Sequence, residues 1–562
     1  MPRLGTLKDT IDDALKSLYI GDFSGGLNSE MDPIDLPINA SPDCENVRVT
    51  KGGRVIGRDG TTVRVSSLPA ANSDGAAFFY DDNGERRLVV FNNGALYDCT
   101  SYTAVLIQSA CYTSGNRVAA TVLNRVLYFS DGETITTVGS DDSGIWKWDP
   151  VNSPTSASIL ISAGTAGTIE TPAAKCLTTY AGSLVLGRIK YVGGTYAKHA
   201  VMWSNVNDPT TIVGTNIFQV GQGQGGEINA VVPMAVTAVG VSPYRAIFVG
   251  KSEQGIYHLK GALTVSDLSE VLINAPTGVL DGATVQFIPG VDGAGYIVWL
   301  GTDYKVWFTS GVESGELSLP IRSELASAIQ ERHIIHTDPK FTSVRHFKRF
   351  QYILDIGKDE NGVSTAYVYD WDLKIWTRYK RFPSGFWCEA KDTNGQAAIY
   401  CADGDDLQQA DTGTTDNGTQ IEPYWKTGFA HAELVDILKV WHWIYISYMT
   451  DDTDLVITAT VNHGRGSSSV KTIAFDSDGS DAASLWDEAI WDTDTWEVTN
   501  HEQYPPYKRR TRLTVETTEG SKGLLNGYDV QVKIAQSSDG GHFEILGFNL
   551  LYLPRGRKRV AV

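Results

Sequence analysis

The chain of 562 residues lacks several of the signals that fix a protein class at once. It has only six cysteines and no CxxC pair, which argues against a zinc ribbon and predicts reduced, half-buried thiols in a protein made in the cytosol. Cys99 and Cys111 flank one predicted hairpin, so the sequence leaves their pairing open. No apolar run reaches the ~20 residues of a membrane helix, so no membrane insertion is expected. Met1–Lys16 has acidic residues and no apolar segment, unlike a signal peptide.

Positive charge is also scarce. The 47 Lys and Arg are outnumbered by 66 Asp and Glu, which gives a formal net charge of −19 at pH 7. A protein that grips nucleic acid by its phosphates is usually basic on one face, which excludes an ordinary DNA-binding protein. Two basic clusters interrupt this background, and we expect them at subunit or adaptor contacts, with DNA phosphate as the alternative partner. They are Lys508, Arg509, Arg510 and Arg512, and Arg555, Arg557, Lys558 and Arg559.

Few segments have the apolar spacing of a helix. Near the start, Leu7, Ile11, Leu15 and Leu18 share one helical face, which predicts a short N-terminal helical arm that docks on its own chain or on a neighbour. A second short helix is expected over Ser323–Glu331.

The next segment, residues 23–60, is rich in Gly, Pro and short polar residues, so it predicts an extended strap. We expect the strap to end in a strand at Asn46–Thr50 and a hairpin through Gly52-Gly53.

In contrast to the few helical segments, strand–turn–strand units are abundant in the sequence. One such unit cannot bury both of its faces, whereas a ring of units can, because each sheet then packs on the next. The repetition predicts an all-β chain with a β-propeller of about seven blade-like units over 51–415, preceded by the arm and strap over 1–50. The strap is one possible source of a strand for the last blade. The units are Leu88–Asp98, Val126–Val138, Ser183–Trp203, Ala246–Leu259, Tyr296–Phe308, Phe350–Trp376 and Ala397–Gln409.

The remainder, 416–562, has longer alternating segments separated by turn residues, which predicts a C-terminal antiparallel β-sandwich. The expected strands are Val435–Met449, Asp454–Val461, Thr511–Thr518, Tyr528–Ala535 and His542–Leu553.

Motifs that carry chemistry are weak, and we expect no catalytic centre, no cofactor and no required metal. Gly221–Gly226 matches GxGxxG, but the β-prone segment Glu227–Ala235 follows in place of a helix, so a corner between two blades is favoured over a nucleotide site. His333 and His336 lack a third ligand at zinc spacing, so a polar loop is expected. The Asp-rich stretch Asp476–Asp481 lacks the closing Glu of an EF-hand loop, which leaves only weak calcium binding as an alternative.

Tryptophan is plentiful, and its two clusters allow two interpretations. Exposed rings would stack on sugars, whereas buried rings would fill gaps between sheets, which we favour because a large ring buries much area. The clusters are Trp371, Trp376 and Trp387, and Trp486, Trp491 and Trp496.

Short segments in a particular order resemble the tail nozzle or hub proteins of short-tailed bacteriophages. Each match is mostly turn and aromatic residues, but together they span nearly the whole chain. They are Phe23–Asn28, Asp32-Pro33, Leu36-Pro37, Asn39-Ala40, Glu45–Val47, Gly57–Gly60, Trp203–Asn205 with Asp208-Pro209, Gly223–Ile228, Ala246–Tyr257, Leu317–Ile321, Tyr367–Tyr379, Trp486-Asp487, Trp491-Asp492 and Trp496.

The resemblance implies a structural virion protein made in the host bacterial cytoplasm and located in the phage tail. It implies a ring of identical copies, expected to be a hexamer, around the path of duplex DNA, with the head-to-tail adaptor and tail fibres or spikes as further partners. It transfers no catalytic residue and leaves open a nozzle, a DNA-retaining plug or another baseplate piece. The alternatives are a carbohydrate-binding propeller that recognises a host receptor and a propeller glycosidase, which needs two carboxylates across its central cleft.

Overall fold

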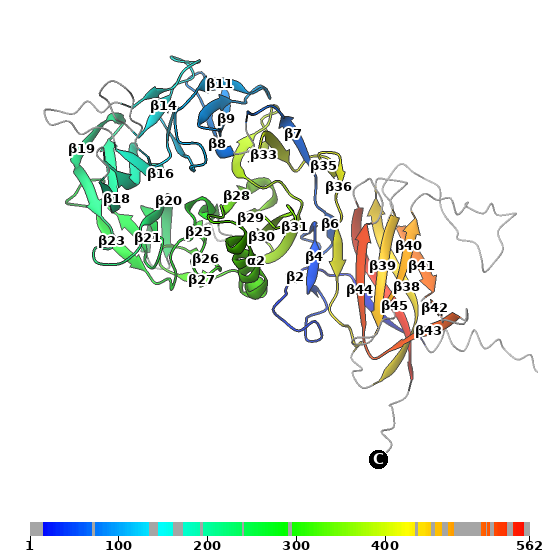
Figure 1. Ribbon diagram of the computed structural model, residues 1–562. Coiled ribbons are helices and arrows are strands. Elements are labelled where there is room, and N and C mark those ends of the chain that lie inside the picture. The colour runs from blue at the N-terminus through cyan, green and yellow to red at the C-terminus, as the bar shows by residue number, and fades with distance from the viewer. Residues whose placement is uncertain are drawn as a thin grey trace, which may run out of the picture. The chain divides into compact units, whose positions relative to one another are not determined.

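The computed structural model describes residues 15–69, 73–133, 144–160, 172–191, 195–238, 241–289, 295–432, 437–450, 456–463, 470–476, 507–512, 514–516, 522–536 and 543–555. The chain forms two compact units, both in Figure 1. The first, called the propeller unit, holds Thr61–Lys374 and Arg381–Thr412. The second, called the sandwich unit, holds Met1–Gly60, Ile375–Lys380 and Gly413–Val562.

The described part of the propeller unit contains seven antiparallel sheets, which confirms the predicted β-propeller (Figure 1). Six of the seven predicted strand–turn–strand units each supply two neighbouring strands of one sheet. Of the unit Val126–Val138, only the first strand, Val126–Ser130, is seen in its sheet, and the residues beyond Glu133 lie outside the described residues. The strands are, sheet by sheet, β8 (Ser73–Tyr80), β9 (Arg86–Asn92), β10 (Ala95–Asp98) and β11 (Val105–Gln108); β12 (Ala119–Leu123), β13 (Val126–Ser130), β14 (Trp146–Trp148) and β15 (Ser158–Ile159); β16 (Ala173–Tyr180), β17 (Ser183–Lys190), β18 (Tyr196–Asn205) and β19 (Asp208–Gln219); β20 (Ile228–Ala238), β21 (Val241–Lys251), β22 (Ile256–Lys260) and β23 (Ser269–Ile273); β24 (Gln286–Pro289), β25 (Gly295–Leu300), β26 (Val306–Thr309) and β27 (Ser314–Glu316); β28 (Thr342–His346), β29 (Gln351–Lys358) and β30 (Ser364–Asp370); and β32 (Phe386–Lys391), β33 (Ala397–Asp403), β34 (Asp406–Ala410) and β7 (Thr61–Val65).

The hairpin between β9 and β10 shows how the sequence forms these sheets. Asn92 pairs with Ala95, so the loop consists of Asn93 and Gly94 alone. Both have positive φ, 51° and 77°, as a type I′ turn requires. Asn and Gly tolerate that conformation at little cost, and its twist matches the twist of the flanking strands.

Strand β9 also shows why neighbouring sheets need one another. Its residues alternate between two buried clusters, because successive side chains of a strand point to opposite faces. Val89 and Phe91 pack with Leu127 and Phe129 of the second sheet. Leu88 and Val90 pack with core residues of the seventh sheet, including Tyr400 and Leu407. A strand buried on both faces explains the nearly continuous apolar sequence.

The ring closes through pairing between distant parts of the chain. β7 lies antiparallel to β34, with Leu407 opposite Val65 and Gln409 opposite Thr62. Val65 is 2% exposed and packs in the cluster that joins the first and seventh sheets. The seventh sheet thus takes its outer strand from the residues that directly follow the predicted strap.

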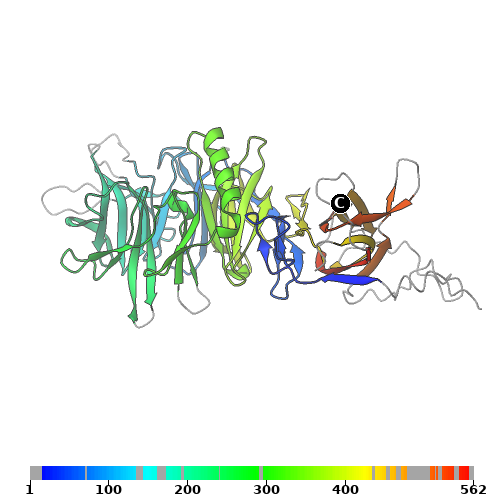
Figure 2. The ribbon, with the colours of Figure 1, turned by 90° about the horizontal axis from the view of Figure 1, so that it is seen from below.

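One α-helix, α2 (Arg322–Ile335), is present among the described residues, and it includes the predicted helix at Ser323–Glu331. Leu325 and Ile329 face the core, and Glu324 accepts a hydrogen bond from the Tyr367 hydroxyl at 3.0 Å. Figure 2 shows α2 alongside the sheets of the propeller. Short 3-10 turns are η1 (Gly282–Thr284), η2 (Leu319–Ile321) and η3 (Phe347–Arg349).

The sandwich unit contains two large antiparallel sheets, which confirms the predicted β-sandwich. One sheet has the order β42-β43-β38-β45-β6-β5, with β1 on β45 and β41 on β38, and the other has the order β4-β37-β44-β39-β40. The strands are β1 (Lys16–Ile20), β2 (Gly26–Leu27), β3 (Ala40–Ser41), β4 (Asp43–Glu45), β5 (Val47–Val49), β6 (Val55–Gly57), β31 (Ile375–Lys380), β35 (Thr415–Asp416), β36 (Thr419–Gln420), β37 (Tyr424–Lys426), β38 (Leu438–Thr450), β39 (Val456–His463), β40 (Val470–Asp476), β41 (Tyr507–Arg512), β42 (Thr514–Glu516), β43 (Lys522–Gly527), β44 (Val530–Gln536) and β45 (Phe543–Arg555).

A buried arginine holds the strap within the sandwich unit. Arg58 is 4% exposed, and its Nη1 donates to Asp416 at 2.8 Å, while its Nε donates to the side-chain oxygen of Asn46 at 2.9 Å. Nearby, the amide of Gly60 donates to the carbonyl of Gly413 at 2.9 Å. A Cβ at Gly60 would overlap the backbone of Thr415, so glycine is required there. Segments about 350 residues apart therefore fold together.

Two expectations need correction. The predicted N-terminal helical arm lies mostly outside the described residues, but its last part is wrong, because Lys16–Ile20 forms β1 and pairs with β45. Backbone pairing along this strand, together with burial of Ile20, outweighs the helical spacing of the apolar residues. The six cysteines are all free, as predicted, and Cys99 and Cys111 are not paired, but the thiols are buried rather than half-buried.

Closure by β7 predicts a strong response to charge at Val65. Val65→Asp should lower the free energy of unfolding by about 3 kcal/mol or more, because the carboxylate would enter an apolar cluster without a partner. Urea unfolding of the full chain measures the loss. Ser67→Asp makes the same charge change at an exposed position and should stay within about 0.5 kcal/mol of the wild type. Equal stability of the two variants would contradict the closure.

Candidate functional site

The predicted basic contact clusters are only partly described. Lys508, Arg509, Arg510 and Arg512 all lie on β41, which pairs with β38 in the sandwich unit. Arg555 is the exposed last residue of β45, opposite Leu438. Arg557, Lys558 and Arg559 lie outside the described residues. The four residues of the first cluster and Arg555 of the second thus belong to the same sheet, because β41 and β45 both pair with β38.

The structure also shows where the other motifs that were considered as possible ligand sites lie. Gly221–Gly226 lies between β19 and β20, and a strand follows it in place of the helix that a nucleotide site requires. His333 lies near the end of α2 rather than in a loop, with its ring 5.6 Å from those of Tyr304 and Phe341. No cluster of metal-ligating side chains occurs in the described parts of the chain. The stretch Asp476–Asp481 lies outside them, apart from its first residue.

The tryptophans of the first cluster are buried. Trp371, Trp376 and Trp387 are 6%, 1% and 9% exposed, so they fill the interior as favoured and are not available for stacking on sugars. Trp486, Trp491 and Trp496 lie outside the described residues.

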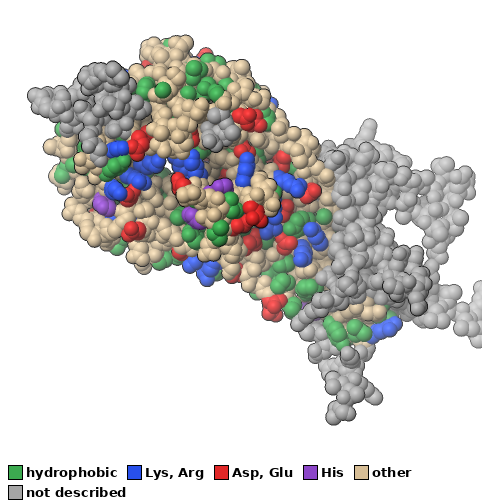
Figure 3. Space-filling view, viewed as in Figure 1, with side chains coloured by type: hydrophobic (Ala, Val, Ile, Leu, Met, Phe, Trp, Pro, Cys, Tyr) green, Lys and Arg blue, Asp and Glu red, His purple; other side chains and the backbone are tan. Residues whose placement is uncertain are grey.

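Sequence reasoning missed a cavity at the centre of the propeller unit. It has a volume of about 630 Å³, within the range of small-molecule sites. Its wall includes residues of the innermost strands of all seven sheets, among them Ala76, Ala120, Lys175, Ala230, Gln286, Thr342 and Phe386. We call it the central cavity. Figure 3 shows Lys and Arg side chains gathered around the centre of this face of the propeller.

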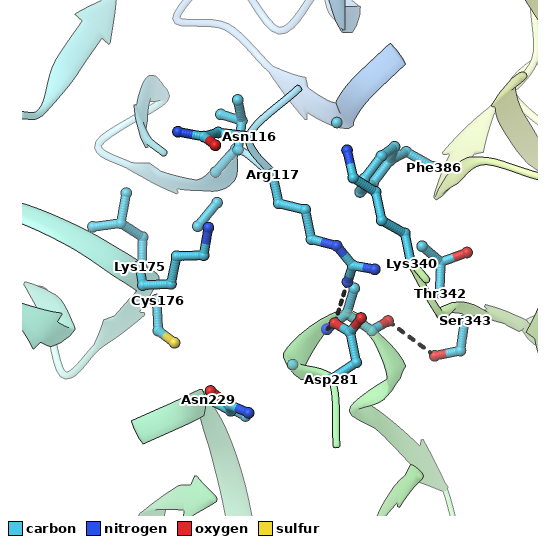
Figure 4. A pocket seen from close by; sticks show the side chains of 18 of the residues that line it. Asn116, Arg117, Lys175, Cys176, Asn229, Asp281, Lys340, Thr342, Ser343 and Phe386 are labelled. Carbon is cyan, nitrogen blue, oxygen red and sulfur yellow. Dashed lines mark hydrogen bonds and ion pairs between the residues drawn. The ribbon is translucent and has the colours of Figure 1, made fainter. Parts of the chain in front are cut away.

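An ion pair crosses the cavity between two sheets. Arg117, just before β12, pairs through Nη1 with Oδ1 of Asp281 (Figure 4). Asp281 caps η1 by accepting from the amide of Ala283 at 3.0 Å, and it also accepts from the amide of Phe341 at 3.2 Å. Burial raises the pKa of Asp281, and the guanidinium of Arg117 opposes that shift. A Cβ at Gly282 would overlap the carbonyl of Asn229, so glycine lets η1 lie against β20.

Two further basic residues that line the central cavity, Lys175 and Arg188, belong to the third sheet. The Lys175 ammonium donates to the carbonyl of Asp131 at 3.4 Å, and burial lowers its pKa, helped by repulsion from Arg188 and Arg117. Arg188 lies at a β-bulge in β17, where its φ is 52°, and pairs with Glu227. Bulges re-aim side chains, which explains how a residue of a second strand reaches the cavity. Burial raises the pKa of the adjacent Cys176 thiol to about 12, so it stays protonated.

Lys340, in the loop before β28, is the fourth basic residue of the cavity wall, after Arg117, Lys175 and Arg188. Its ammonium donates to the carbonyl of Gly115 at 2.7 Å and lies 3.6 Å from the buried carboxylate of Asp74. Lys340 and Arg117 also lie 5.8 and 5.6 Å from the centre of the Phe386 ring, within reach of cation–π attraction. Figure 4 shows Arg117, Lys175 and Lys340 pointing towards one space.

The cavity suits anion binding better than acid–base catalysis. Its two carboxylates are Asp281 and Asp338. A glycosidase needs one of a carboxylate pair free as acid and the other as nucleophile or base. Both oxygens of Asp281 already accept hydrogen bonds from the protein. No sequence motif could have revealed these four basic residues, because they are scattered between positions 117 and 340 and come from three different parts of the ring.

No family model matches the chain, and no curated protein matches it by sequence. Among solved structures, BBS1N in complex with ARL6DN is similar with a TM-score of 0.39 and 11% identity, covering 63% of this chain and 96% of that one. The extracellular domain of a hybrid two-component system from B. thetaiotaomicron has a TM-score of 0.41 and 9% identity, covering 87% and 62%. An exo-β-1,3-galactanase from Phanerochaete chrysosporium has a TM-score of 0.24 and 9% identity, covering 77% and 95%.

The Arg117–Asp281 pair predicts a test of the cavity wall. Asp281→Ala should lower the free energy of unfolding by about 3 kcal/mol, because it removes a cap and leaves a partly buried guanidinium without its partner. Chemical unfolding measures the change. Asp338→Ala removes the other, exposed carboxylate of the cavity and should cost less than about 0.5 kcal/mol. A small effect of Asp281→Ala would show that the ion pair does not stabilise the wall.

Proposed function

We propose that the protein is a structural component of a bacteriophage tail. Its copies would assemble side by side into a hexameric nozzle or hub ring, below the portal adaptor, through which DNA leaves the virion. The observation that carries the proposal is the ordered series of segments that resemble this family, from the strap at Phe23–Asn28 to Trp496. The partners are further copies of the chain, the adaptor protein and tail fibres or spikes.

Several of these family-like residues have defined structural tasks, which supports the proposal. Arg58 and Gly60 hold the strap inside the sandwich unit. Asn205 and Asp208 face each other across the turn between β18 and β19. Residues 317–321 lead through η2 into α2. The matching residues therefore lie at connections between elements of the fold, where proteins that share this architecture would be expected to need them.

The charge of the chain supports passage of DNA rather than its capture. At −19 per chain, a large surface left after assembly is expected to be negative. A basic lumen would hold the duplex through many phosphate contacts, whereas an acidic or neutral one would centre it and let it slide. No helix in the described residues is long and apolar enough to cross a membrane.

Weak DNA binding is therefore an expected property. Fluorescence anisotropy with a labelled duplex at physiological salt should show no tight complex of the full chain. A dissociation constant well below that of ordinary non-specific binding, which is about 10⁻⁴–10⁻⁶ M, would contradict the proposed lumen. A basic DNA-binding protein at the same salt concentration serves as the positive control.

The C-terminal basic cluster should act in assembly. Replacing Arg555, Arg557, Lys558 and Arg559 together with Ser should reduce the ring population in sedimentation velocity, because charge pairing with a neighbouring copy or the adaptor is lost. The unfolding midpoint of the free protein should hardly change, since Arg555 is exposed. Replacing exposed Lys51, Lys260, Lys374 and Lys391 in the propeller unit and strap removes the same number of charges and offers a control. An unchanged ring population would contradict this role, because the contact between subunits would then lie at other residues.

A carbohydrate-binding propeller is the second candidate. The cavity favours it, because small ligands often occupy such spaces. Burial of Trp371, Trp376 and Trp387 weakens it. A glycan array separates the two candidates, and turnover of a polysaccharide would support an enzyme instead.

A further inference from the structure

The central cavity reverses the charge balance of the chain. Four basic side chains and two carboxylates line it, Arg117, Lys175, Arg188, Lys340, Asp281 and Asp338, whereas acidic residues predominate overall. The excess is confined to the residues that line the cavity, because Arg188 pairs with Glu227 and Lys340 lies 3.6 Å from Asp74, and neither of these carboxylates lines it. A concave wall with excess positive charge attracts anions, and low-dielectric surroundings strengthen the attraction.

Two of the basic groups have unused hydrogen-bonding capacity. Nη2 of Arg117 is buried and has no hydrogen-bond partner among the described residues, although Nη1 of the same guanidinium pairs with Asp281. Within the same residues, the Lys175 ammonium makes one hydrogen bond, the 3.4 Å donation to the Asp131 carbonyl, while an ammonium carries three donors. Buried donors without partners cost free energy, and a ligand oxygen would satisfy them.

The cations also repel one another. Arg188 and Arg117 both lower the pKa of Lys175, so the three charges act on the same space. Arg188 reaches the cavity through a bulge with left-handed φ, a conformation that is unfavourable for a side chain larger than glycine. Strain and repulsion both reduce stability, and a bound anion would relieve the repulsion.

We propose that the central cavity binds a small anion bearing phosphate groups, with Lys175, Arg188 and Nη2 of Arg117 as its main donors and Lys340 as a further one. A volume of about 630 Å³ accepts a ligand of nucleotide size. Guanidinium groups match the fork of two phosphate oxygens, and Lys supplies a point charge. The site goes beyond the proposed tail function, because it lies within one propeller and does not require a ring.

Isothermal titration calorimetry of the full chain tests the site, with inorganic tripolyphosphate and ATP as probes at 150 mM salt. One anion per chain is expected, and the melting temperature should rise with probe concentration. Tripolyphosphate and ATP distinguish a bare polyphosphate site from one that also accepts a nucleoside. A labelled duplex serves as a competitor and should not displace the probe.

Lys175→Met is the main variant, since methionine retains most of the apolar stem. It should weaken probe binding about tenfold or more, because a charge-assisted contact is lost. Without probe, its unfolding midpoint should equal or exceed that of the wild type, since a repelled, partly buried cation is removed. Lys260→Met removes an exposed lysine of β22 outside the cavity and should leave binding unchanged.

Three results with the small probes would overturn the proposal, and a fourth with duplex DNA. The first three are the absence of binding heat and thermal shift with both probes, equal affinity of the wild type and Lys175→Met, and equal weakening by Lys260→Met. Displacement of the probe by duplex DNA would also contradict it, because a duplex would then occupy the basic surface.

Discussion

Pairing of β7 with β34 is the constraint on which the rest of the molecule depends. A sheet in a ring has two faces to bury, and the first and seventh sheets bury theirs against each other only if the ring is closed. Val65 lies in the cluster that joins them, together with Leu88 and Tyr400. The hydrogen bonds and the apolar packing of this single strand therefore stabilise sheets that are hundreds of residues apart.

Closure also decides how the chain ends fold. Because β7 begins at Thr61 and β34 ends at Ala410, the segments before and after the ring start close together, and Gly60 bonds to Gly413. The strap then joins the C-terminal strands in one unit, with β4 paired to β37 and both β1 and β6 paired to β45. Arg58 links these segments by donating hydrogen bonds to Asn46 and Asp416. The strap is thus a structural part of the sandwich unit.

Local patterns were sufficient to predict six of the seven hairpin units, α2 and the sandwich, because turn residues such as Asn93-Gly94 and strand alternation act over short distances. Pairings between chain ends were not predictable, since nothing local in Thr61–Val65 specifies β34 as its partner. Tertiary pairing likewise overrides the helical spacing near Leu18. The central cavity escaped detection because Arg117, Lys175 and Lys340 meet only after the ring forms.

Charge is distributed unevenly in this chain, with a basic pocket inside the propeller, basic residues on one sheet of the sandwich unit, and an acidic remainder. We propose that such chains form a ring around DNA without gripping it. Electron cryomicroscopy of the purified full chain tests this most directly. We expect closed rings whose lumen is lined by acidic or neutral side chains, with Arg555 and its neighbours at contacts between subunits. Monomers without rings at high concentration, or a lumen lined by the basic clusters, would contradict it.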